Sequence, residues 1–255
     1  MMKAHIKWQG KILETNLANP LSISIPIKDG PNNPNCYFAE PVKFEVNRSD
    51  GFVGSIRLGG SVNHRKITIS PHGNGTHTEC YGHITDSDAV IATHLQEHLH
   101  VAQLISINPL ENNGDLVIDS AHLDNLSLIS GIKALIVRTL PNTSKKILHN
   151  YSGSNPAYFT YEAMQTIVDH GIEHLVTDLP SVDKEQDEGN LLAHKAFWQI
   201  EGTIRANATI TELAYIENNI EDGFYLLDLQ VLNLYMDASP SNPILYSLNT
   251  ITDLI

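Results

Sequence analysis

The distribution of apolar positions along the chain predicts a strand-rich α/β protein. Runs rich in β-branched and aromatic residues, bounded by Gly, Pro and Asn, are typical of strands. Such runs cover residues 21–27, 51–58, 65–70, 101–107, 115–118, 133–140, 172–179, 209–216 and 224–236. The run at 133–140 is almost continuously apolar, which is the pattern of a strand buried on both faces of its sheet.

Two segments carry the signals of helices. In the first, Thr160 is a candidate N-cap, apolar residues follow at helical spacing, and Gly171 comes just after the expected end. The second covers residues 188–199. The first helix leads directly into the strand at 172–179, which is the local pattern of α/β proteins. Because no repeat or linker divides the chain, we predict one mixed α/β domain over residues 1–255.

Composition and charge restrict the classes of partner. Hydrophobic residues make up 42% of the chain, which is enough for a sizeable core. The chain has 16 Lys and Arg against 29 Asp and Glu, a net charge of −13, which argues against nucleic-acid and anionic-membrane partners. No apolar run is long enough for a signal peptide or a membrane span, and the two cysteines form no disulfide framework. We therefore expect a cytoplasmic protein.

Potential metal ligands are concentrated in HGNGTHTECYGHI, residues 72–84. The glycines predict a tight loop at HGNG, followed by an extended THTE in which His77 and Glu79 point to the same side. An imidazole beside a carboxylate commonly holds Zn²⁺ or a similar ion. His72 can fold back across the loop, and His83 can reach the same pocket as a proton carrier. A lone histidine is more often a surface or core residue, so distant ligands are also required.

The same stretch resembles the signature of a known family. GTHTECYGH is similar to the His-x-Gly-Thr-His-x-Asp-x-Pro-x-His motif of the cyclase family, which includes bacterial kynurenine formamidase. Four further segments resemble that family, namely 21–30, 177–183, 210–216 and 224–234. The resemblance implies a swivelling β/β/α domain with a few packed helices. It also implies a homo-oligomer, a dimer or tetramer, with a partner subunit near the active site.

Carried over by position, the resemblance implies a set of functional residues. His77 and Glu79 would be the first ligands, and Glu79 stands where the family has an aspartate that bridges two metals. His194 and Glu212 would be the distant ligands of one or two divalent ions, Zn or Mn. His83 would be the general acid–base. Independently of the resemblance, Glu212 lies in an apolar strand, where a buried carboxylate needs a metal or a basic partner.

Besides the glutamate at Glu79, the chain departs from the family motif at two points. The first family histidine falls on Gly73, and His72 stands one residue earlier, so the loop must absorb this shift for His72 to be a ligand. Cys80 and Tyr81 replace the usual Ala-Pro. We expect Tyr81 to line the substrate pocket and Cys80 to pack in the interior, because on a strand it points away from Glu79.

The function implied is that of a metal-dependent hydrolase that opens a small amide, formamide or cyclic amide. This arylformamidase-like activity, with N-formylkynurenine among the candidate substrates, would belong to tryptophan catabolism. The alternative is a non-catalytic descendant that binds a small molecule, which the changes at His72 and Glu79 favour. Two weaker readings are an inverted zinc-protease motif at 94–98 and a Cys80 thiol nucleophile beside His83.

Overall fold

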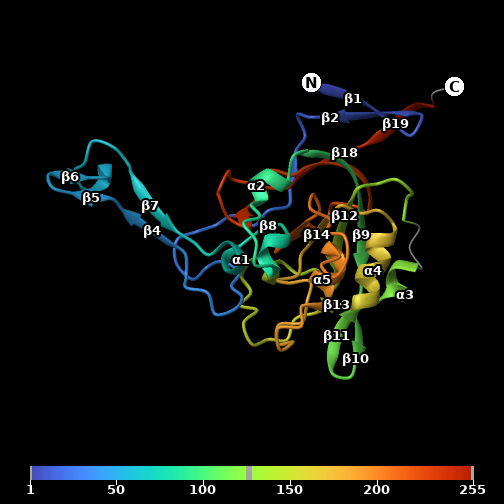
Figure 1. The fold of residues 1–255 in the computed structure, drawn as a ribbon. Coiled ribbons are helices and arrows are strands. Elements are labelled where there is room, and N and C mark those ends of the chain that lie inside the picture. Colours follow the sequence, from blue (N-terminus) through green and yellow to red (C-terminus); the bar gives the residue numbers. More distant parts are fainter. Residues whose placement is uncertain (1, 125–127, 254–255) are drawn as a thin grey trace.

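The computed structural model describes residues 2–124 and 128–253 and confirms a strand-rich mixed α/β fold (Figure 1). Within these residues a nine-stranded sheet has the order β17-β8-β15-β14-β12-β9-β16-β18-β3. Its strands are β3 (Leu21–Ser22), β8 (His77–Glu79), β9 (Leu99–Ile107), β12 (Ala134–Thr139), β14 (His174–Thr177), β15 (Thr209–Glu212), β16 (Gly223–Asp228), β17 (Ala238–Pro240) and β18 (Ile244–Ser247). The four central strands β15, β14, β12 and β9 are parallel, and their neighbours on both sides are antiparallel.

Both faces of the parallel strands are covered, as the continuous apolar run at 133–140 predicts. Every residue of β12 is buried. Leu135 and Val137 belong to a core shared with the helices on one face, whereas Ala134 and Ile136 belong to the core on the other. The first face carries α3 (Ser120–Asp124), α4 (Tyr161–Asp169) and α5 (Leu192–Trp198), and the second carries α2 (Ile91–His94). A parallel sheet covered in this way keeps its strands away from water.

The two helices predicted from the sequence agree with the structure to different degrees. Helix α4 begins after Thr160, whose hydroxyl accepts a hydrogen bond from the Ala163 amide at 3.2 Å, and Gly171 follows it at φ +78°. Helix α5 starts four residues later than the predicted start of 188–199. The reason is that the Asp187 carboxylate accepts hydrogen bonds from the Gly189 and Leu191 amides and folds this stretch into a loop.

Several strand boundaries are corrected by the structure. The predicted strand at 209–216 ends at Glu212, because the next residue, Leu213, has a left-handed φ of +53°. In 21–27 only β3 joins the sheet, since the Ile25 amide donates to the Thr76 hydroxyl instead of to a strand. The run at 224–236 stops at Asp228. The first three residues of HGNG are not a loop but lie in the one-turn helix α1 (Pro71–Asn74), which Gly75 follows, and Pro71 occupies the favoured first position.

Smaller sheets surround the body (Figure 1). Strands β1 (Lys3–Trp8), β2 (Lys11–Asn16) and β19 (Asn249–Asp253) form one, and β10 (Leu110–Asn112), β11 (Asp115–Ile118) and β13 (Tyr158–Phe159) form another. A projecting ribbon pairs β4 (Lys43–Val46) with β7 (Arg65–Thr68) and carries the hairpin β5 (Arg48–Ser49) and β6 (Phe52–Val53). Short 3-10 helices are η1 (Ile56–Leu58), η2 (Tyr81–Ile84) and η3 (Ser144–Leu148). In the described ranges, no helix has the length and apolar character needed to cross a membrane.

Candidate metal centre

Strands β8 and β15 bring the first potential ligands together at the carboxyl end of β15. The two strands are antiparallel and place His77 directly opposite Glu212. Because facing residues of a strand pair project to the same side, the His77 Nε2 atom lies 3.4 Å from Glu212 Oε2. Glu79, two residues further along β8, is fully buried. The extended conformation expected for THTE is confirmed.

Helix α5 supplies His194 from the opposite side of the cluster. Its Nε2 atom lies 3.0 Å from Glu79 Oε1 and 3.8 Å from Glu212 Oε1. The ring is held by Asp183, whose carboxylate accepts a 2.6 Å hydrogen bond from His194 Nδ1 and further bonds from the Ala193 and His194 amides. Asp183 therefore does two things: it satisfies the first turn of α5 and it aims the other ring nitrogen of His194 at the two glutamates.

A more exposed group of residues lies above these buried ones. The His72 Nδ1 atom is 3.1 Å from Glu79 Oε2, and its Nε2 atom is 2.9 Å from Asp237 Oδ2. His83 stacks on His72 with ring centroids 4.1 Å apart. Its Nδ1 atom lies 3.5 Å from Asp237 Oδ2, and its Nε2 atom lies 3.8 Å from Glu79 Oε2. Asp237 thus contacts both rings from the loop that precedes β17.

The hydrogen bonds of the cluster fit a divalent metal ion. The His77 Nδ1 atom must donate to the Gly75 carbonyl, 3.0 Å away, because a carbonyl oxygen only accepts. Nε2 of His77 therefore presents a lone pair to the cluster. This Nε2 atom and Glu79 Oε2 are buried and make no well-aligned hydrogen bond among the described residues, although the His72 ring comes within 3.1 Å of Glu79 Oε2. Burying an acceptor atom without a good hydrogen bond costs free energy. Coordination of a metal ion by these atoms would remove that cost.

The ionisable groups of the cluster shift one another's pKa values. Burial opposes charge on Glu79, yet the rings of His83, His194 and His72 hold its pKa well below the usual range. Burial alone would lower the pKa of His194, but Asp183, Glu79 and Glu212 raise it well above its ordinary value. Burial also opposes charge on His72, whose pKa Asp237 and Glu79 raise to about 10. The site thus keeps Glu79 ionised and attracts positive charge, and a bound cation would release the protons of His194 and His72.

The one-residue shift of His72 has a steric reason in the structure. Gly73 is buried, and a Cβ atom at this position would lie 2.3 Å from Ala39 Cβ. The Cβ atom of Ala39 is fixed to the backbone and cannot rotate away. Position 73 therefore cannot hold a histidine unless the backbone moves. The turn of α1 instead directs His72 towards the cluster, where its ligand atom lies within 4.8 Å of those of His77 and Glu79.

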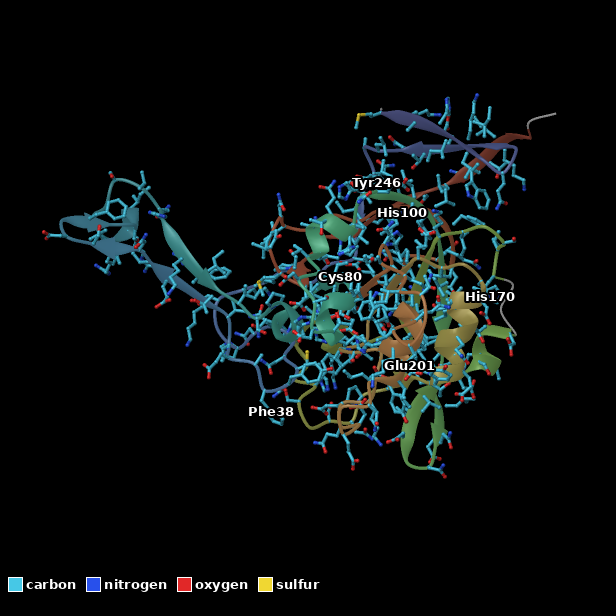
Figure 2. The ribbon with its side chains drawn as sticks, in the orientation of Figure 1. Phe38, Cys80, His100, His170, Glu201 and Tyr246 are labelled. Atoms are coloured by element: carbon cyan, nitrogen blue, oxygen red, sulfur yellow. The ribbon has the colours of Figure 1, made fainter. Side chains whose placement is uncertain are left out.

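Cys80 and Tyr81 are both placed by their packing. Cys80 is fully buried in the second core, as expected, and burial raises the pKa of its thiol to about 11, which disfavours a nucleophilic thiolate. The Tyr81 ring packs edge-on against His94, with centroids 5.0 Å apart, and against the helix-side core. Its role in substrate binding stays a prediction. Figure 2 labels Cys80 near the centre of the body.

The inverted zinc-protease motif at 94–98 lies outside this cluster. His94 contacts Tyr81, and His98 Nδ1 donates to the Leu229 carbonyl at 3.1 Å. Among the described residues, neither histidine belongs to a group of ligand atoms that could hold a metal. The geometry therefore does not support that reading of the sequence.

Three residues near the cluster had no role assigned from the sequence. Asp183 lies inside the family-like segment 177–183, so that segment was the available signal for it. Asp237 has no local signal, because the pairing of β17 with β8 brings it in. Tyr37 adopts an unusual left-handed φ of +55°. Burial raises the pKa of its hydroxyl, Glu212 and Glu79 add to the increase, and Ser181 opposes it.

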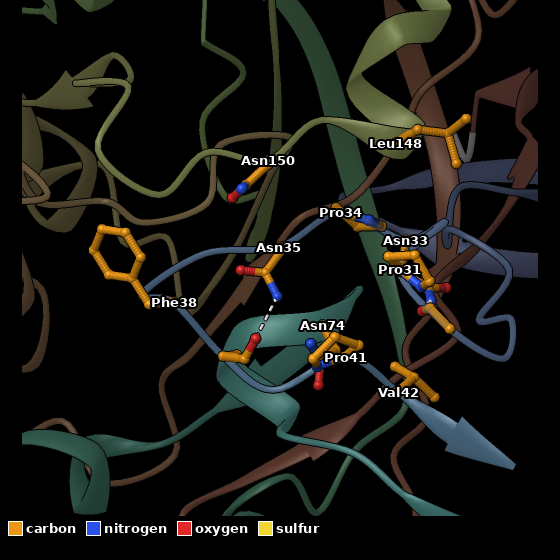
Figure 3. A pocket seen from close by; sticks show the side chains of 12 residues that line it. Pro31, Asn33, Pro34, Asn35, Phe38, Pro41, Val42, Asn74, Leu148 and Asn150 are labelled. Carbon is orange, nitrogen blue, oxygen red and sulfur yellow. Dashed lines mark hydrogen bonds between the residues drawn. The ribbon is translucent and has the colours of Figure 1, made fainter.

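A neighbouring cavity has a different character. It has a volume of about 300 Å³ and lies between the segment 30–42, Asn74 of α1 and the loop that bears Leu148 and Asn150 (Figure 3). None of the residues that line it is ionisable. Asn35 and Asn74 use their side-chain amides to bind the backbone at Ala39 and Glu40, so these groups brace the segment that carries Tyr37. The side chains that could hold a metal ion lie in the His and Glu cluster instead.

We expect the Asp183→Asn substitution to weaken metal binding by about 10–100-fold, the usual cost of losing the partner that orients a ligand. The amide is the same size but cannot receive three hydrogen bonds as an anion. Affinity would be measured by competition with a chromophoric chelator. Asp187→Asn is the matched control, because it alters the same loop without touching His194. An equal loss of affinity in both variants would mean that loop order, rather than ring orientation, matters.

Together, a mixed sheet and a histidine–carboxylate cluster at the end of its parallel strands define a protein with an enclosed candidate metal centre. The family model named Cyclase matches residues 15–184, so the chain belongs to the cyclase family. The resemblance of the sequence to that family is confirmed.

Three individual proteins are similar to this chain, one in sequence and two in structure. The chain is 26% identical over 205 residues to a kynurenine formamidase of Bacillus cereus, covering 78% of this chain and 85% of the relative. A predicted metal-dependent hydrolase from Bacillus stearothermophilus superposes with a TM-score of 0.64 at 17% identity, covering 89% of this chain and 98% of that chain. Isatin hydrolase A from Labrenzia aggregata superposes at 0.63 and 14% identity, covering 89% and 93%.

Proposed function

We propose that this protein is a metal-dependent hydrolase that opens the C–N bond of a small aromatic formamide or cyclic amide. The observation that carries the proposal is the buried set of His77, Glu79, His194 and Glu212, in which two acceptor atoms make no well-aligned hydrogen bond among the described residues. These four residues would hold the first divalent ion, Zn or Mn. His72 would complete the site for this ion or for a second one.

When bound, the divalent ion lowers the pKa of a water molecule and polarises a carbonyl group. The chain supplies the proton transfers. The His83 side chain is 31% exposed, so it can reach both the cluster and an incoming substrate. It would take a proton from the attacking water as the oxygen adds to the carbonyl carbon. The C–N bond then breaks, and His83 returns the proton to the leaving nitrogen.

Asp237 supports this role of His83. Its carboxylate faces the Nδ1 atom of His83, and a carboxylate on one ring nitrogen stabilises a proton gained by the ring. His72 and His83 in turn hold the pKa of Asp237 well below its ordinary value, so the carboxylate stays ionised. The carboxylate of Asp237 would thus orient the His83 imidazole, which acts as the general acid–base towards the substrate.

The substrate class follows from the relatives and from one residue of the site. Two of the three relatives are a kynurenine formamidase and an isatin hydrolase, and kynurenine and isatin are aromatic compounds. Tyr37 is 47% exposed, and burial together with the charge of Glu212 raises the pKa of its hydroxyl. An aromatic ring at this position favours stacking with an aromatic substrate. A cytoplasmic location and the absence of nucleic-acid and membrane partners remain predictions.

The proposal is tested with protein that has been loaded separately with zinc and manganese and offered three amides. We expect hydrolysis of N-formylkynurenine or isatin, measured by the change in absorbance, and little hydrolysis of N-methylformamide, which lacks an aromatic ring. If the metal-loaded, folded protein hydrolyses none of the three but binds the aromatic compounds in calorimetry, the non-catalytic binding protein is the better description.

A further inference from the structure

Two histidines meet at the amino end of the parallel strands. His100 lies in β9 and His174 begins β14, and β12 lies between these strands in the sheet (Figure 2 labels His100). The register places His174 beside Ala134 and Ala134 beside Ala102, so both histidines project from the second face of the sheet, which carries α2. The metal centre includes His194 of α5, on the first face. The histidine pair is therefore separate from the metal centre.

The two rings share one buried site. Each histidine is only 4% exposed, and the ring centroids lie 4.0 Å apart with their planes tilted by 39°. Ala102 and Ala134 are fully buried beside them, and their small side chains leave room for both rings. At this spacing, a charge gained by one ring acts strongly on the other inside the protein.

Both rings are held by hydrogen bonds that suit neutral imidazoles. The His100 Nε2 atom donates to the Glu97 carbonyl at 3.0 Å, because a carbonyl oxygen only accepts. The His174 Nδ1 atom bonds the buried Thr209 hydroxyl at 2.9 Å. The neighbouring Glu173 carboxylate pairs with Lys133 at 3.1 Å. A buried imidazolium needs a carboxylate partner, which these two hydrogen bonds do not provide.

The groups around the pair carry charges of both signs. Burial lowers the pKa of His174 to about 3, and His100, Lys133 and Arg205 add to this shift. Burial also lowers the pKa of His100, although nearby carboxylates oppose the shift. The titratable and charged groups on the elements packed around the pair are Glu97 and His98 ahead of β9, Tyr225 and Asp228 of β16, Lys133 ahead of β12, Glu173 ahead of β14, Arg205 ahead of β15 and His94 of α2.

A small cavity lies against the pair. It has a volume of about 120 Å³ and lies between α2 and the amino ends of β12 and β14, where His174 lines it together with His94, Lys133 and Glu173. The His174 ring can therefore exchange protons through this cavity.

The pair also supports α2 and the segment that follows it. His100 binds the Glu97 carbonyl, and Ile91 of α2 is fully buried in the second core. The Ile91 amide donates to the Met236 carbonyl at 2.9 Å, and Met236 directly precedes Asp237 of the metal centre. Loss of structure around the pair would therefore reach the segment beside the metal centre.

We propose that the His100–His174 pair is an acid-sensitive switch in the fold. Uptake of a proton by either ring places an unpaired charge in the interior, beside a second ring and near Lys133 and Arg205, and so destabilises the folded state. The parts affected are the amino ends of β9 and β14 and helix α2. The inference does not depend on the proposed hydrolytic activity, because its readout is the stability of the protein.

The pH range of the switch follows from the sign of the shift. A histidine in an unfolded chain has a pKa of about 6.5, whereas the pKa of His174 in the folded protein is about 3. The stability that the neutral ring provides is complete above about pH 6.5 and is lost as the pH falls towards 3. Over that range unfolding takes up about one proton at His174, so the unfolding constant rises by up to about tenfold per pH unit.

Urea unfolding at a series of pH values tests the proposal, with tryptophan fluorescence as the signal. We expect the unfolding constant of the wild-type protein to rise steeply between about pH 6.5 and 4.5. His174→Asn keeps a polar atom for Thr209 but cannot take up a proton, so each unit of pH should raise its unfolding constant by about tenfold less. His100→Gln, which keeps a donor for the Glu97 carbonyl, should change the pH dependence in the same direction.

His170→Asn is the matched control, because His170 is exposed and its Nδ1 atom donates to a carbonyl, that of Thr166, at 2.8 Å (Figure 2). This variant should follow the pH dependence of the wild-type protein. A pH dependence of His174→Asn equal to that of the wild type would overturn the proposal. An equally large change in His170→Asn would overturn it too, because the effect would then not belong to the buried pair.

A second measurement applies if either pair variant does not fold. In NMR spectra of the wild-type protein, the two rings are identified by the nuclear Overhauser effect between them. Rings that stay neutral in the folded protein down to about pH 4.5 support the switch, whereas rings that titrate near the ordinary value of about 6.5 reject it.

Discussion

Replacing His77 with alanine is expected to strip the protein of bound zinc or manganese and to abolish hydrolysis. His77 is fully buried, its tautomer is set by the Gly75 carbonyl, and its free nitrogen faces Glu212 across the strand pair. Its removal deletes the ligand atom that lies 3.4 Å from Glu212. Loss of a residue that only orients a ligand lowers metal affinity by about 100-fold at most. We expect the loss of the ligand itself to lower the affinity by more than this.

The measurement is elemental analysis of protein purified without chelators, together with turnover of the amide panel. His100→Ala is the matched control, because His100 is also buried and also bonds a backbone carbonyl, that of Glu97, at 3.0 Å. Both variants remove a buried ring, so a general loss of stability would appear in both. Metal retained in the His77 variant at the wild-type level would falsify the assignment of this cluster as the metal centre.

The sequence predicts contacts between residues that are close together in the chain better than contacts between distant residues. The pairing of His77 with Glu79 follows from the two-residue period of a strand, a local rule, and the structure confirms that period. That His194 and Glu212 join them could not be derived locally. The His194 and Glu79 side chains are 115 residues apart in the chain. Only the family resemblance brought these distant positions into the prediction.

Glycine produced the main local error. Gly73 and Gly75 in HGNG suggested a loop that exploits unusual backbone angles, whereas α1 includes Gly73 within a helical turn. Gly73 is required by the close approach of Ala39, a contact between segments that sequence spacing does not reveal. The same limit applies to Asp237, which reaches His72 and His83 only because β17, a strand of three residues, pairs with β8.

Replacing His83 with glutamine is expected to lower turnover by about 10²–10⁴-fold, the usual contribution of a general acid–base, while the bound metal remains. Glutamine is close in size and polar, but it cannot take a proton from water and return it to nitrogen. His83 is the partly exposed ring of the cluster nearest Asp237 after His72, and the fully buried ligands do not depend on it for their orientation. Metal content and turnover should therefore separate in this variant.

The control is His94→Gln, which changes a half-buried histidine outside the cluster that packs against Tyr81. It should leave both turnover and metal content near wild type, and it also tests whether the protease-like motif has any part in the activity. Turnover and metal content must both be measured. Loss of a proton carrier lowers turnover alone, whereas loss of a metal ligand lowers turnover and metal content together. If His83→Gln loses metal in parallel with activity, His83 acts as a ligand. If it keeps full activity, the proton must be carried by another group, and the exposed face of the cluster would have to be reassigned around His72 and Asp237, whose direct 2.9 Å contact offers the alternative relay.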